Sequence, residues 1–91
     1  MNKRDILKVV GTGIDTLGKV DFTNPDNLEL SKAFIEDAIS IIKDSVSLQE
    51  AIHMVEFERE VKSVISDMGP EDVIRILNKL GERVNGYSYP S

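Results

Sequence analysis

The chain has 91 residues, of which 41% are hydrophobic and 30% charged; it has no cysteine and a formal net charge of −5 at pH 7. This length and composition indicate one globular domain, without disulfides or a thiolate metal site. The acidic balance, with scattered Lys and Arg, disfavours nucleic-acid binding, and no apolar run suits a membrane span or a signal peptide, so we expect a cytoplasmic protein that binds no membrane.

The first segment has two possible interpretations. A helix over residues 3–18 is predicted by four apolar residues that share one helical face, Ile6, Val10, Ile14 and Leu17. Three glycines oppose it, each by ~1 kcal/mol relative to alanine: Gly11, Gly13 and Gly18. Residues 5–10 could instead form a short strand that ends at a glycine. We expect the helix, because no second strand is available, with the glycines allowing a close helix approach or a break near Thr12.

Residues 25–44 are predicted to form the second helix. Asn24 is a suitable N-cap, Pro25 fits the first helical turn, and Asp26 is favoured near the positive end of the helix dipole. The apolar residues of this segment are Leu28, Leu30, Phe34, Ile35, Ala38, Ile39, Ile41 and Ile42. Because they cover about half of the helix circumference, we expect this helix to contact two neighbours.

The third helix is predicted over residues 47–68. Ser47 and Glu50 have the spacing of a capping box, in which the serine hydroxyl and the glutamate each satisfy a free backbone N–H. The link to the second helix is short, which predicts that the two helices form an antiparallel hairpin.

This third helix has two apolar stripes that point in different directions. The longer stripe contains Met54, Phe57, Val61, Val64, Ile65 and Met68. The shorter stripe lies roughly a third of a turn away, and contains Leu48, Ala51, Ile52 and Val55. A helix packed on one flat layer needs a single apolar face, so we expect this helix to be wedged between neighbours, a second copy of the chain among them. The residues that we assign to partner binding on it are Met54, Phe57, Val61, Val64 and Met68.

The fourth helix is predicted over residues 70–85, followed by a short tail, 86–91. Gly69 and Pro70 separate it from the third helix. Tyrosine is enriched at protein interfaces, so we add Tyr87 and Tyr89 of the tail to the partner-binding residues. The four segments together predict an all-α fold, a small antiparallel bundle of about four helices.

The split apolar surface favours binding of another protein. The single histidine and the absence of cysteine leave no Ser-His-Asp or Cys-His arrangement, so we expect no catalysis, no cofactor and no metal. The predicted function is that of a small interaction module, an adaptor, inhibitor or regulatory subunit. It would act through apolar helix faces, bind another protein and form a homodimer.

Two other functions stay open as alternatives. The turn at Gly69 followed by a helix that carries Arg75 is similar to a helix-turn-helix of a DNA-binding regulator, although acidic residues begin that helix. Glu50 and His53 have the Glu-x-x-His spacing of di-metal sites in four-helix bundles. Such a site would require a dimer, with Glu36, expected level with the turn that contains His53, as an extra ligand.

Overall fold

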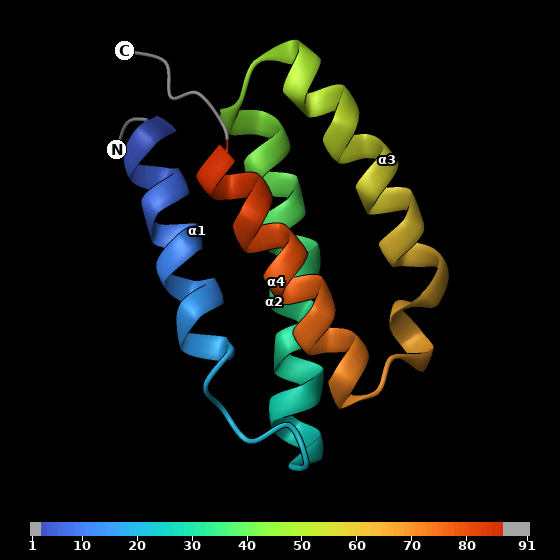
Figure 1. Ribbon diagram of the computed structural model, residues 1–91. Helices are drawn as coiled ribbons and strands as arrows, with labels where there is room; N and C mark the ends of the chain where they lie inside the picture. Colours follow the sequence, from blue (N-terminus) through green and yellow to red (C-terminus); the bar gives the residue numbers. More distant parts are fainter. Residues whose placement is uncertain (1–2, 87–91) are drawn as a thin grey trace.

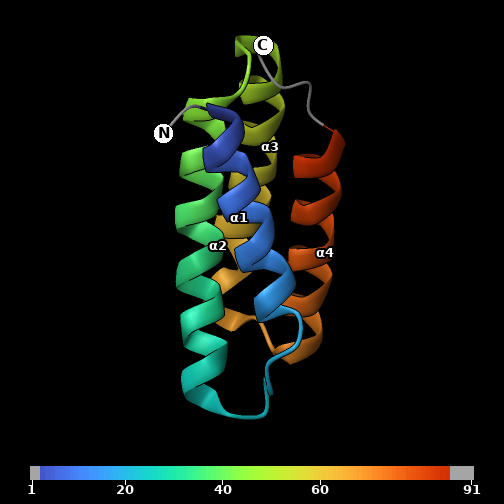
Figure 2. The same cartoon turned by 90° about the vertical axis from the view of Figure 1, so that its left-hand side faces the viewer.

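The computed structural model describes residues 3–86, which form four helices that alternate in direction along the bundle (Figures 1 and 2). The helices are α1 (Lys3–Leu17), α2 (Pro25–Ser45), α3 (Leu48–Val64) and α4 (Pro70–Gly86), and a 3₁₀ turn, η1 (Ile65–Asp67), follows α3. No strand occurs within residues 3–86. The predicted all-α antiparallel bundle is therefore confirmed, and the first segment is a helix.

The starts of α2 and α3 follow from their capping residues. The Asn24 side chain accepts a hydrogen bond from the Asp26 backbone N–H at 2.9 Å, and Pro25 is the first helical residue of α2. At α3 the backbone N–H of Glu50 donates to the Ser47 hydroxyl. That hydroxyl in turn donates to the Glu50 carboxylate at 3.0 Å. In the predicted capping box, the carboxylate would accept from a backbone N–H instead. Both predicted N-caps are confirmed.

The predicted third helix is too long at its C-terminal end. Regular α-helix ends at Val64, whose backbone departs from helical angles with φ −127° and ψ −8°, and one 3₁₀ turn continues to Asp67. In a 3₁₀ turn residues three apart lie above one another. Ile65 in this turn and Met68 just after it are both buried, so the inward-facing stripe continues past the end of the regular helix.

Helix α2 is the centre of the bundle. It packs against α1, α3 and α4, one neighbour more than the wide apolar arc predicts. Its buried side chains are Ser31, Ile35, Ala38, Ile39, Ile42 and Ser45. This arrangement gives α2 the wedged position that we expected for α3.

Helix α3 lies along the outside of the bundle, on the flank opposite α1 (Figures 1 and 2). Its close helical neighbour is α2, and an ion pair joins the two helices: the Lys43 ammonium of α2 lies 2.9 Å from the Glu58 carboxylate of α3. The Arg83 guanidinium of α4 stands 4.7 Å from the centre of the Phe57 ring. The expectation that α3 is wedged between neighbours on two sides is wrong for the part of the chain that the structure describes, because one face of the helix is exposed there.

Gly13 explains how a glycine-rich segment forms α1. A Cβ atom added at Gly13 would lie 2.8 Å from two atoms of the Phe34 ring, closer than nonbonded carbon atoms approach. The glycine therefore lets α1 approach the aromatic ring of α2. The close approach is the outcome that the structure shows, and α1 continues through Thr12 without a break.

Candidate functional site

Most of the residues that we assigned to partner binding form the core of their own chain. Met54, Phe57, Val61 and Met68 retain 0–4% of their surface, and belong to the cluster that packs α2, α3 and α4 together. Their side chains are covered within the chain and offer no surface to a partner in this fold. Val64 is 48% exposed. Tyr87 and Tyr89 lie outside the described residues.

The shorter stripe of α3 faces away from the bundle. Leu48 is 80% exposed, Ile52 55% and Val55 41%, and we call these three side chains the outer stripe. They follow one another at intervals of four and three residues, so they form one ridge on the first two turns of α3. Three large apolar side chains on one helix face, over which no other helix of residues 3–86 is packed, form the candidate interaction surface.

The sequence carried a signal for this assignment that we did not use. The longer stripe, which we call the inner stripe, runs from Met54 to Met68, nearly four turns. The outer stripe ends at Val55. A stripe that packs against a neighbour helix must follow it along the contact, so the longer stripe is the better candidate for the core. The shorter stripe is then left for the solvent side.

Basic residues continue the outer stripe toward the C-terminal end of α3. Arg59 and Lys62 lie four and seven residues after Val55, which places them on the same helix face, and both are exposed. No ion pair joins either of them to another described residue. The ridge on the exposed side of α3 is thus apolar in its first half and carries Arg59 and Lys62 in its second half, beside the exposed carboxylates of Glu56 and Glu60.

The residues of the alternative metal site lie apart. His53 is exposed on α3. Glu36 lines a cavity of about 370 Å³ together with Ile65 and Ser66 of η1, which follow His53 by roughly three helical turns. The expectation that Glu36 lies level with His53 is wrong. Residues 3–86 contain no group of three or more His, Asp or Glu side chains arranged to hold a metal ion.

The start of α4 is occupied by contacts that do not favour DNA binding. The Arg75 guanidinium donates to the Asp72 carboxylate at 2.9 Å, and Glu71 adds a second acidic side chain to the first turn. Val73 and Leu77 are buried against the bundle. A recognition helix presents Arg, Lys or Asn to DNA at this position, whereas α4 presents acidic groups.

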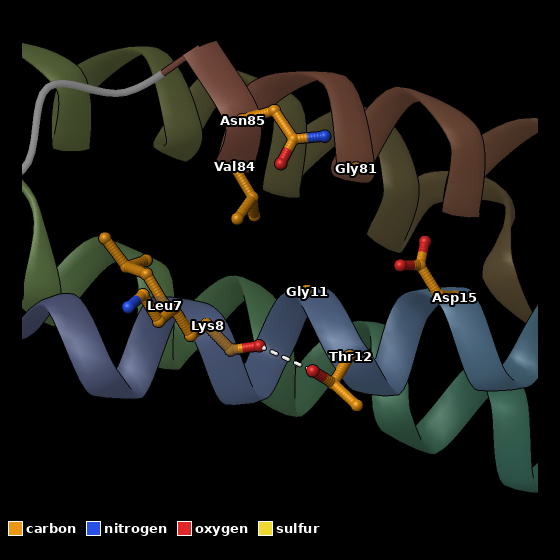
Figure 3. Close-up of a pocket in the computed structure, with 8 residues that line it drawn as sticks. All are labelled: Leu7, Lys8, Gly11, Thr12, Asp15, Gly81, Val84 and Asn85. Carbon is orange, nitrogen blue, oxygen red and sulfur yellow. Dashed lines mark hydrogen bonds between the residues drawn. The ribbon is translucent and has the colours of Figure 1, made fainter.

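A groove between α1 and α4 is the second surface feature of note. It consists of two adjoining cavities of about 350 and 510 Å³, which share Asp15, Gly81 and Asn85. In the first cavity, shown in Figure 3, Val84 points from α4 into the gap beside Gly11, and Asp15 points from α1 toward α4. Lys8 and Thr12 complete the α1 side. We call this feature the α1–α4 groove.

Neither a protein-family model, a curated protein nor a solved structure matches this chain. Within residues 3–86, no helix combines the length and the apolar character needed to cross a membrane.

Proposed function

We propose that this protein is a small cytoplasmic interaction module, an adaptor, inhibitor or regulatory subunit without catalytic activity, that binds another protein through the outer stripe of α3. The observation that carries the proposal is the exposure of Leu48, Ile52 and Val55 on one ridge. Burial of each ~100 Å² of such surface contributes about 2.5 kcal/mol before the costs of association. The outer stripe is an anchor of that kind.

The charges on the same face indicate what the partner looks like. Arg59 and Lys62 extend the ridge with positive charge, and Glu56 and Glu60 lie exposed beside them, so the complementary partner surface has apolar residues followed by charged residues of both signs. An amphipathic helix of the partner, lying along α3, meets both requirements. Self-association as a homodimer is also part of the proposal, because a chain of 91 residues buries a smaller fraction of its surface on folding than a larger domain does.

Photo-crosslinking in the organism that produces the protein tests the α3 surface. A benzophenone amino acid replaces Ile52 in one variant and Lys79, an exposed side chain of α4, in the control variant. We expect one crosslinked product of defined mass from position 52 and none of that mass from position 79. Adding Leu48→Ser and Val55→Ser to the position 52 variant should remove the product. Equal products from both positions, or no product at position 52, would contradict the proposal.

A further inference from the structure

We propose that two copies of this chain pair through the α1–α4 groove, with their α1 helices antiparallel and crossing near Gly11. The inference rests on the proposed self-association, and it assigns the homodimer to a surface separate from the outer stripe of α3. The occupant of the groove is then the α1 helix of a second copy.

The charges along the first cavity of the groove are self-complementary. Lys8 and Asp15 both line the first cavity, and their seven-residue separation places them on one face of α1 about 10 Å apart along the axis. Both side chains are exposed, and no ion pair joins either one to another residue among those the structure describes. A two-fold axis midway between them, beside Gly11 and Thr12, brings Lys8 of each copy opposite Asp15 of the other copy.

The same charges exclude the other orientation. In a parallel pair, Lys8 would face Lys8 and Asp15 would face Asp15, and like charges across an interface are unfavourable. An antiparallel pair makes two identical Lys–Asp contacts, as a closed two-fold interface requires. The residue at the crossing is a glycine, which allows the two helix backbones to approach closely.

Two glycines of the groove are not required by the fold of a single chain. A Cβ atom added at Gly11 would lie 3.9 Å from Val84, and one added at Gly81 would lie 3.5 Å from Ile14. Both distances are ordinary contacts, in contrast to the 2.8 Å at Gly13, where a side chain would require the Phe34 ring to shift. Alanine at either position would favour the helix. The space that Gly11 and Gly81 leave open is therefore available to a second molecule.

Sedimentation equilibrium with the full chain tests the pairing. We expect the wild type to change from monomer to dimer as its concentration rises from about 1 µM to 1 mM. Lys8→Glu and Asp15→Lys should each weaken the dimer about tenfold, because each replaces two attractions by two repulsions. The double variant Lys8→Glu with Asp15→Lys restores opposite charges and should restore the dimer. Failure of the double variant to do so overturns the inference.

Two further variants separate this inference from the proposed function. Gly11→Ala should raise the melting temperature of the dilute monomer by about 4 °C and yet weaken the dimer, a combination that a purely structural glycine would not produce. Ile52→Ser, on the outer stripe, should leave the dimer unchanged. A dimer that is lost in Ile52→Ser but unaffected by the groove variants would overturn the assignment of the dimer interface to the groove, while the proposed self-association would stand. A wild type that stays monomeric throughout would overturn both.

Discussion

The two apolar stripes of α3 contain the same kinds of side chain in opposite environments. Met54, Phe57 and Val61 are buried against the bundle, whereas Leu48 and Ile52 are in water. Hydrophobic character alone does not decide which of the two contributes to folding; the positions of α2 and α4 decide it. The inner stripe therefore accounts for the attachment of α3, and the outer stripe is free for contacts outside the chain.

The largest expected effect is on the inner stripe. Phe57→Ala removes a ring that is 3% exposed and should lower the free energy of unfolding by about 3–5 kcal/mol, measured by urea denaturation. Phe57→Leu is the matched control, since it keeps apolar volume but removes the ring under the Arg83 guanidinium. We expect it to cost about 1 kcal/mol. A loss below that value for Phe57→Ala would mean that α3 is held to the bundle by other contacts.

An intermediate effect is expected at the N-terminus of α3, which belongs to neither stripe. Ser47→Ala removes the hydroxyl that caps the Glu50 backbone N–H and should cost about 1 kcal/mol in the free energy of unfolding. Ser63→Ala is the matched control on the same helix. The Ser63 hydroxyl donates to the Glu60 carbonyl, a bond that does not stabilise a helix. The midpoint temperature of thermal unfolding should therefore be unchanged or slightly higher. Equal losses from both variants would argue against the cap.

The smallest effect is expected on the outer stripe. Ile52→Ser exchanges residues of similar helix propensity at a position that the fold leaves exposed, and should change the free energy of unfolding by less than about 0.5 kcal/mol. The same exchange at Ile39, which is buried in α2, should be strongly destabilising. Calorimetry of both variants measures the two losses. A loss at position 52 that approaches the loss at position 39 would show that the outer stripe is covered.

The features that the sequence could predict are local. The starts of the helices at Pro25, Leu48 and Pro70 depend on residues within one turn, and a cap such as Asn24 acts on the backbone two residues later. The antiparallel order follows from the short link at Ser47. These determinants are complete within a few residues, so they can be recognised without knowing where the other helices lie.

The features that the sequence could not predict depend on distant segments. Which stripe of α3 faces inward is indicated in the sequence only by the relative lengths of the two stripes, and it is decided by where α2 and α4 lie. The length of α3 depends on the change to a 3₁₀ turn after Val64, and the position of Glu36 depends on the register of the α2–α3 hairpin. Gly13 is another example, because its reason is the Phe34 ring twenty-one residues later.

The attachment of α3 mainly to α2 also has a dynamic consequence. Segments that share little buried area with the rest of a domain open without global unfolding, and their amide protons exchange with solvent sooner. Helix α2, which contacts every other helix, should then protect its amides up to the full unfolding free energy, while those of α3 exchange earlier. A ligand that covers the outer stripe should slow deuterium uptake across α3 most of all.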